Sequence, residues 1–235
     1  MKKLFFILVS IYFLNSYSFT LVIDPGHGGP FEGSASCNNK ILEKDLVLEI
    51  AQQLVPLLKK QLPKINIVLT RTSDTDFADQ IDTALARRSD FIRQQKPDLF
   101  ISIHSNKSTN ANVRGCELYV PYRDTPDIAS YAAALYIHHE LVHASPAGWS
   151  GKLGNLNMYD RGIRQARFRV LQAVTCPSVL IELDYLTNPE AEKLYLSETY
   201  KKKITEALAQ GIIAACNNLT PATNTRKSGS KKCQN

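Results

Sequence analysis

Short, almost uniformly apolar runs alternate along the chain with stretches of helical periodicity. The apolar runs predict strands at residues 19–24, 65–69, 99–103, 115–120, 168–171 and 179–183. A strand with one solvated face alternates apolar and polar residues, whereas a strand buried on both faces is apolar nearly throughout. The pattern therefore predicts a mostly parallel, roughly six-stranded sheet that is covered on both sides.

Helical spacing occupies the segments between these runs. Leucine or isoleucine recurs every four residues from Leu42 to Leu62, which predicts a helix that Pro56 should kink or divide. Further helices are predicted at 78–95, at 127–143, near Ile163, from Asn188-Pro189 and at 197–216, with a loop at 145–160. Strands that alternate with helices predict an α/β fold, a single three-layer α/β/α domain.

The two ends of the chain differ in composition from the segment between them. Two lysines, an apolar run and small residues at 16 and 18 predict a signal peptide over 1–18, cleaved after Ser18. The alternative is a retained membrane anchor, although the apolar run is shorter than the ~20 residues that span a bilayer. Residues 218–235 are basic and polar, which predicts a disordered tail. The catalytic domain is expected over 19–217.

Charge and cysteine content add few constraints. The formal net charge of +6 is modest. The basic tail has two open interpretations, attraction to an anionic polymer or membrane surface and simple solvation. The five cysteines form no CxxC pair, which argues against a cysteine zinc cluster. Export would permit disulfides, but the odd number leaves at least one cysteine unpaired in a monomer.

Candidate chemistry gathers where the predicted strands end. His27 lies in a glycine turn after the first strand, and His104 directly follows the run 99–103. The carboxyl ends of parallel strands share one edge of the sheet, where ligand sites form in α/β folds. Two imidazoles and a carboxylate are a common ligand set for catalytic zinc, and Glu43, in the first turn of the next helix, is the candidate carboxylate.

Two further acids are placed near this edge. Glu182 lies inside the apolar run 179–183, where an ionised carboxylate needs a partner. A zinc-bound water would be one, and Glu182 could carry its proton. Asp24, three residues before His27, is a candidate acceptor that orients a ligand imidazole. Taken singly, each residue also has an ordinary structural interpretation, such as a polar strand end, a solvated helix position or half of a buried ion pair.

The chain resembles the zinc N-acetylmuramoyl-L-alanine amidases with a three-layer α/β catalytic domain. The resemblance rests on an ordered set of segments that spreads over most of residues 19–217. These are LVIDPGHGG (21–29), Glu43-Lys44, LTRTSD (69–74), FISIHSN (100–106), RGCELYV (114–120), RGIRQARFRVLQ (161–172) and PSVLIELDYLTNPEAEKL (177–194).

The resemblance implies a site and an activity. One Zn²⁺ per chain would be held by His27, Glu43 and His104, with Glu182 as the catalytic glutamate. The substrate would be peptidoglycan or muropeptides, cleaved between the lactyl group of N-acetylmuramic acid and L-alanine, in cell-wall remodelling, recycling or daughter-cell separation. We expect an exported monomer, in the periplasm rather than outside the cell, and no nucleic-acid partner. Polar candidates for substrate contact are Asn106, Tyr122, Arg161 and Arg164, whereas Arg71 is expected to be structural.

Two departures from the family pattern stand out. Asp184-Tyr185 follows the catalytic glutamate where the family usually has Gly-Phe, which could change how the peptide is held. Some relatives carry a long helix that plugs the zinc site until a partner protein removes it. The segment between Val120 and Arg161 is short for such a plug, so we expect no inhibition of that kind, although an activator protein remains a candidate partner.

Two other functions compete with this interpretation. His139, Glu140 and His143 spell the HExxH pattern of zinc metalloproteases, in which both histidines share one helix face. No third ligand follows in a helical context, and an amphipathic surface helix explains the pattern equally well. The second alternative is a non-catalytic peptidoglycan-binding regulator, which the complete set of site residues disfavours.

Overall fold

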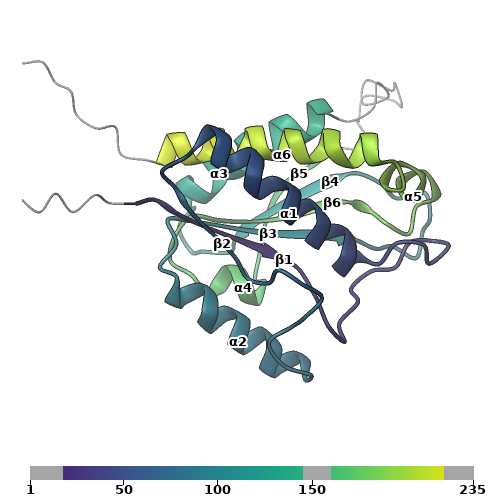
Figure 1. Ribbon diagram of the computed structural model, residues 1–235, viewed down its shortest axis with the longest axis horizontal. Helices are drawn as coiled ribbons and strands as arrows, with labels where there is room; N and C mark the ends of the chain where they lie inside the picture. Colours follow the sequence, from purple (N-terminus) through teal and green to yellow (C-terminus); the bar gives the residue numbers. More distant parts are fainter. Residues whose placement is uncertain (1–17, 145–159, 220–235) are drawn as a thin grey trace, which may run out of the picture.

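The computed structural model describes residues 18–144 and 160–219, and a six-stranded sheet forms its centre (Figure 1). The strand order is β2-β1-β3-β6-β4-β5. The strands are β1 (Thr20–Pro25), β2 (Asn66–Leu69), β3 (Leu99–Asn106), β4 (Cys116–Pro121), β5 (Asp160–Ala166) and β6 (Ser178–Tyr185). β2, β1, β3 and β6 are parallel, β4 pairs antiparallel with β6, and β5 pairs parallel with β4. The predicted mostly parallel sheet is confirmed.

Helices cover both faces of the sheet. The helices are α1 (Glu43–Gln61), α2 (Ile81–Gln94), α3 (Ile128–Ala144), α4 (Arg169–Gln172), α5 (Pro189–Tyr195) and α6 (Glu198–Leu219). α1, α3 and α6 lie on one face, and α2 and α4 lie on the other (Figure 1). The three-layer architecture is therefore confirmed. None of these described helices has the length and apolar character needed to cross a bilayer.

The main core lies between the sheet and α1, α3 and α6. Leu46, Ile50, Leu54 and Leu58 of α1 are 0–3% exposed, as their spacing predicts. The expectation that Pro56 divides this helix is wrong, because α1 is continuous from Glu43 to Gln61. Pro56 and Gln52 are both exposed, so water can bond the Gln52 carbonyl that has no N–H partner at Pro56.

For two neighbouring elements the predicted type is wrong, because the predicted helix is a strand and the predicted strand is a helix. Residues near Ile163 form β5 instead of a helix, and the apolar run 168–171 forms α4 instead of a strand. β5 is an edge strand in which no residue is fully buried, so it lacks the apolar run of an inner strand. The run at 168–171 is apolar because Val170 and Leu171 are buried in a second cluster with Ile92 of α2 and Phe100 of β3.

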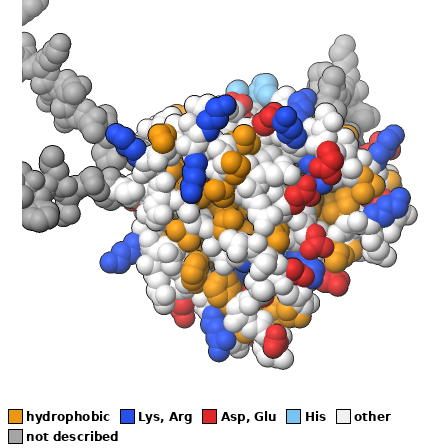
Figure 2. Space-filling model, viewed as in Figure 1, with side chains coloured by type: hydrophobic (Ala, Val, Ile, Leu, Met, Phe, Trp, Pro, Cys, Tyr) orange, Lys and Arg blue, Asp and Glu red, His pale blue; other side chains and the backbone are white. Residues whose placement is uncertain are grey.

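Several predictions concern residues outside the described part of the chain. These are the signal peptide up to residue 17, the loop at 145–159, the tail from residue 220 and Cys233. Within the described part, Cys37, Cys116 and Cys176 are thiols. The face shown in Figure 2 carries lysine, arginine and acidic side chains intermixed, so the basic balance of the sequence forms no continuous patch there.

Candidate functional site

Three side chains from three elements meet at the carboxyl ends of β1 and β3. His27 follows β1, Glu43 is the first residue of α1, and His104 lies near the end of β3. One ligand atom from each lies within 4.8 Å of the others, and this is the group of metal-binding side chains found among the described residues. The convergence expected from the strand ends is therefore present.

Glu43 is the centre of this cluster. Its side chain is buried, and Oε1 contacts His27 Nε2 at 3.1 Å and His104 Nδ1 at 2.9 Å. The backbone N–H groups of Ser105 and Ser34 donate to Oε1 and Oε2 at 3.0 and 2.6 Å. Burial alone would raise the pKa of Glu43, but the imidazole contacts outweigh it and hold the pKa well below its usual range. The carboxylate is thus ionised and fixed in place.

Glycines allow the backbone to lie against these side chains. A Cβ at Gly26 would lie 2.2 Å from Cε1 of His104. Gly33 has a φ of +74°, and a Cβ there would lie 2.4 Å from Oε2 of Glu43 and 2.7 Å from Cδ2 of His27. Any larger residue would have to displace the cluster or strain the loop.

Two buried arginines hold the turn that carries His27. Arg71 donates to the carbonyls of Pro25, Gly26, Ser73 and Lys44, which agrees with the structural role expected for it. Arg88 of α2 donates to the carbonyl of His27 and to the carboxylates of Asp24 and Asp76. Sequence reasoning did not identify Arg88, although its spacing of four residues from Ala84 and from Ile92 puts it on the buried face of α2.

Asp24 serves this scaffold. Its carboxylate accepts hydrogen bonds from Thr70, Ser102 and Arg88. The hydrogen bond expected from a ligand imidazole to Asp24 is therefore replaced by these three. Burial opposes ionisation, yet the charge of Arg88 and these donors lower the pKa of Asp24. Its negative charge still attracts His104, although it makes no direct contact of the expected kind.

Glu182 lies on β6 directly opposite His104 of β3. Among the described residues, its Oε2 is a buried oxygen without a hydrogen-bond partner. Burial, together with the negative charges of Glu43 and Glu117, raises the pKa of Glu182 to about 8. A buried polar atom with no partner calls for a ligand, an ion or water beside it.

Sequence reasoning missed Glu117, a buried acid on the strand next to β6. Glu117 of β4 lies opposite Glu182 on its other side and is 1% exposed. Tyr119, Tyr185 and Arg161 donate to its carboxylate, and Arg164 forms an ion pair with it. Although burial acts against it, these donors lower the pKa of Glu117. The run CELYV (116–120) carried a signal for Glu117, an acid inside an apolar strand, but such an acid was noted only for Glu182.

The four predicted substrate contacts have different positions. Arg161 and Arg164 of β5 lie at the site edge, on Glu117. Asn106 ends β3, where its side chain accepts from the backbone N–H of Lys107. Tyr122 is not at this edge: β4 runs antiparallel to β6, so the residue after β4 lies at the opposite end of the sheet.

The donor set of the cluster suits a metal ion. Two imidazoles and one carboxylate, with no thiolate, match the ligand sets of catalytic zinc sites, which keep one position for water. The orphaned oxygen of Glu182 lies on the strand beside His104, where it could accept from such a water. The residues present therefore fit Zn²⁺.

The HExxH residues lie elsewhere, on α3. His139 and His143 stack with ring centroids 4.2 Å apart. Their Nδ1 atoms contact Glu140 and the carbonyl of His139. Within residues 18–144 and 160–219, no third His, Cys, Asp or Glu completes a metal-binding group with them. The arrangement matches the surface-helix alternative.

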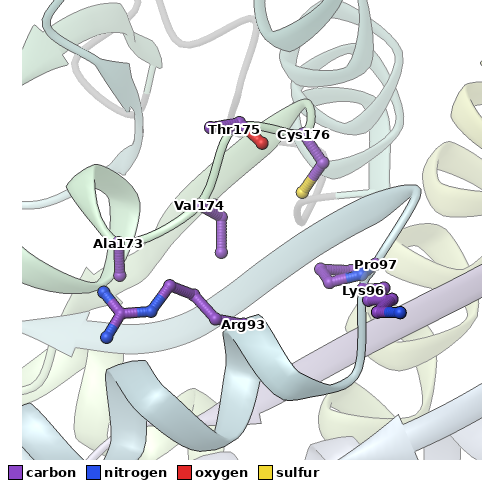
Figure 3. Close-up of a pocket in the computed structure, with 7 residues that line it drawn as sticks. All are labelled: Arg93, Lys96, Pro97, Ala173, Val174, Thr175 and Cys176. Carbon is purple, nitrogen blue, oxygen red and sulfur yellow. The ribbon is translucent and has the colours of Figure 1, made fainter.

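A separate pocket lies at the other end of the sheet. It is lined by Arg93, Lys96 and Pro97 and by residues 173–176, which face one another across it (Figure 3). Pro97 precedes β3 and Cys176 precedes β6, so this pocket is at the amino ends of the strands that carry His104 and Glu182. It plays no part in the site described above.

Comparisons with known proteins point to one family. A family model described as Amidase_3, N-acetylmuramoyl-L-alanine amidase, matches residues 21–214. The catalytic domain of the amidase CwlV from Bacillus (Paenibacillus) polymyxa var. colistinus is 32% identical, with a TM-score of 0.68 over 83% of this chain and 96% of that one. An amidase from Clostridium difficile 630 is 31% identical, with a TM-score of 0.70 over 85% and 97%.

Curated relatives give the same picture. AmiA of Escherichia coli K12 is 30% identical over 83% of this chain and 75% of its own length. AmiC of Escherichia coli O6:H1 is 28% identical over 83% of this chain. This chain spans about half the length of some of these relatives, 52% for AmiC and 56% for the probable AmiB of Haemophilus influenzae.

Proposed function

The chain belongs to the N-acetylmuramoyl-L-alanine amidase family, and from that premise we propose that it hydrolyses the amide between N-acetylmuramic acid and L-alanine in peptidoglycan. One Zn²⁺ is held by His27, Glu43 and His104, and Glu182 is the catalytic acid and base. The observation that carries the proposal is the meeting of these three donors beside a buried carboxylate oxygen that has no partner among the described residues.

Zinc, when bound, would lower the pKa of a coordinated water and polarise the substrate carbonyl. The chain's own residues supply the remaining functions. Glu43 keeps its negative charge through four contacts, so it can balance the charge of a cation. Glu182, one strand away from His104, accepts a proton from the attacking water and returns it to the departing alanine nitrogen. Arg71 and Arg88 keep His27 in place.

The cellular setting is part of the same proposal. The protein is exported to the periplasm and cleaves peptidoglycan or muropeptides during cell-wall remodelling, recycling or daughter-cell separation. It acts as a monomer and binds no nucleic acid. α3, the described helix between β4 and β5, packs against α6 on the face away from α2 and α4, and the proposal includes a site that works without a plug. An activator protein remains a candidate partner.

The test is digestion of muropeptides of known composition, followed by mass spectrometry. The protein should release free stem peptides, lose activity in chelator and recover it with added zinc. Glu182→Gln should still bind zinc but lose activity by about 10²–10⁴-fold, the usual contribution of a general acid and base. Muropeptides that bind but stay intact would support the non-catalytic regulator instead.

A matched pair of double variants separates the amidase site from the HExxH residues. His27→Ala/His104→Ala should abolish zinc binding and amidase activity. His139→Ala/His143→Ala, which removes the same two side-chain types from α3, should leave both unchanged. The reverse pattern would place the metal on α3 and make the metalloprotease the better interpretation.

A further inference from the structure

Glu117 is held by several side chains near the site, yet no step of the proposed reaction uses it. Four side chains contact its carboxylate: Tyr119 at 2.5 Å, Tyr185 at 3.0 Å, Arg164 at 3.0 Å and Arg161 at 3.2 Å. Glu117 itself is 1% exposed. Two tyrosines and two arginines from three strands are thus tied to one buried anion.

The position of Glu117 carries a cost in stability. Glu117 lies directly opposite Glu182 on the neighbouring strand, and like charges in facing positions destabilise a sheet. An apolar residue at 117 would avoid that cost and would match its neighbour Leu118, which is buried in the core. What the acid provides is an anchor for the two guanidinium groups.

Both guanidinium groups keep donors for an outside acceptor. Arg161 contacts Glu117 through Nε, and Arg164 contacts it through Nη1. The side chains remain 31% and 53% exposed, respectively. Arg161 also lies over the Tyr185 ring, 5.1 Å from its centroid, which restricts its orientation. Two positive charges on one buried negative charge leave a net positive surface beside Glu182.

We propose that Arg161 and Arg164, positioned by Glu117, form a subsite that binds a carboxylate of the stem peptide. The inference rests on the proposed function and adds which half of the substrate lies over β4 and β5. In the scissile bond the carboxyl group of the muramic acid half is consumed in the amide, whereas the peptide half carries ionised carboxylates. An arginine pair recognises such a carboxylate through charge-assisted hydrogen bonds. The peptide therefore extends from Glu182 across Glu117 towards β5.

Tyr185 connects this subsite to the Asp184-Tyr185 pair, which stands where the family usually has Gly-Phe. Asp184 accepts from Arg114 and from the N–H of Gly115, which fixes the end of β6 next to the start of β4. The Tyr185 hydroxyl then donates to Glu117. A phenylalanine at 185 would lack this donor. The Asp-Tyr pair therefore restricts the position of Glu117, and through it the positions of the two arginines.

The test compares two matched muramoyl peptides, one with free peptide carboxylates and one with the same carboxylates amidated. The wild-type protein should cleave the free acid with a kcat/KM about tenfold or more above that of the amide, mainly through KM. Arg161→Ala/Arg164→Ala should reduce this ratio to near one. Arg161→Lys/Arg164→Lys should keep part of it, because lysine retains charge without the planar fork.

Two further variants assign the roles. Glu117→Gln keeps the shape of the side chain but not its charge, so it should also lower the ratio of the two kcat/KM values. Both substrates are measured at one pH, so any change in the ionisation of Glu182 affects both and cancels in the ratio. Arg167→Ala is the control, because Arg167 is exposed and stacks on Tyr122, 4.0 Å from its ring centroid, at the far end of the sheet. It should keep the wild-type ratio.

The inference is overturned if wild-type protein shows no preference, or if the double alanine variant keeps it. Cleavage of neither substrate would instead count against the proposed function. In that case calorimetry of the free peptide acid and its amide still decides the inference. Weaker binding of the acid by Arg161→Ala/Arg164→Ala than by wild type supports it, and equal binding by both proteins overturns it.

Discussion

Three carboxylates near the site show how partners, and not burial alone, set ionisation. Burial raises the proton affinity of Glu43, Glu117 and Glu182 alike. Glu43 and Glu117 each have at least four donors or cations around them, so their pKa values fall. Glu182 has an oxygen without a partner among the described residues, so its pKa rises to about 8. An acid that must both take and give a proton benefits from this last environment.

The raised pKa of Glu182 predicts a pH-dependent stability when metal is removed. Between its ordinary value of 4.5 and about 8, the folded protein holds a proton on Glu182 that the unfolded chain has lost. The free energy of unfolding therefore falls as pH rises through this window. Glu182→Gln cannot ionise, so its advantage over wild type should grow from near zero below pH 4.5 to roughly 2–4 kcal/mol above pH 8.

Urea unfolding in chelator, at several pH values for both proteins, measures this difference. Gln210→Ala, an exposed position on α6 without a titratable side chain, is the control and should show no such trend. A difference between Glu182→Gln and wild type that stays constant from pH 4 to pH 9 would contradict the argument.

Residue by residue, sequence reasoning succeeded where position along one strand was enough. His27 and His104 were placed by the ends of apolar runs and Glu182 by its position inside one, and the structure brings them to one edge. Arg88 and Glu117 were missed, because their importance comes from partners 64 and 44 residues away along the chain. Only the pairing of strands and the packing of α2 reveal those contacts.

At the scale of elements, the direction of β4 decides which predicted residues reach the site. Apolar content predicted that a strand exists at 115–120 but carries no information on whether it runs parallel or antiparallel. Because β4 is antiparallel to β6, its first residues, including Glu117, lie beside Glu182, and Tyr122 lies at the other end. The exchange of type between β5 and α4 has a similar origin, since an exposed edge strand and a short buried helix give misleading apolar patterns.

The contact between α3 and α6 gives a prediction with an unusual sign. Gly211 of α6 lies so close to α3 that a Cβ would be 2.5 Å from the Cα of Ile137. Glycine to alanine inside a helix ordinarily stabilises it by about 1 kcal/mol. Here the added methyl must push two closely packed helices apart, so Gly211→Ala should lower the free energy of unfolding by about 1–3 kcal/mol.

Chemical denaturation with unchanged zinc content is the measurement. Gln210→Ala, at the exposed neighbouring position, should be neutral or slightly stabilising. A stabilising Gly211→Ala would show that α3 and α6 are less tightly packed than their close approach indicates.

At the scale of the whole molecule, the site joins parts of the chain that are far apart in sequence. Glu43 and His104 are separated by 61 residues, and His27 belongs to a turn that Arg88 of α2 holds from the other face of the sheet. A ligand that bridges the turn after β1, the start of α1 and the end of β3 binds only when all three are in place. Binding to this edge is therefore coupled to the folding of the domain.

This coupling predicts that zinc stabilises the protein against heat. A ligand that binds only the folded state at about 1,000 times its Kd adds about 4 kcal/mol. For a domain of this size each kcal/mol raises Tm by about 2–4 °C, so zinc should raise Tm by roughly 10 °C over protein in chelator. Differential scanning calorimetry of His104→Ala, compared with its own chelated sample, should show little or no rise, since one of three ligands is gone. His139→Ala/His143→Ala should keep the full rise. If His104→Ala is stabilised as much as wild type, the ion that stabilises the fold lies outside the cluster of His27, Glu43 and His104.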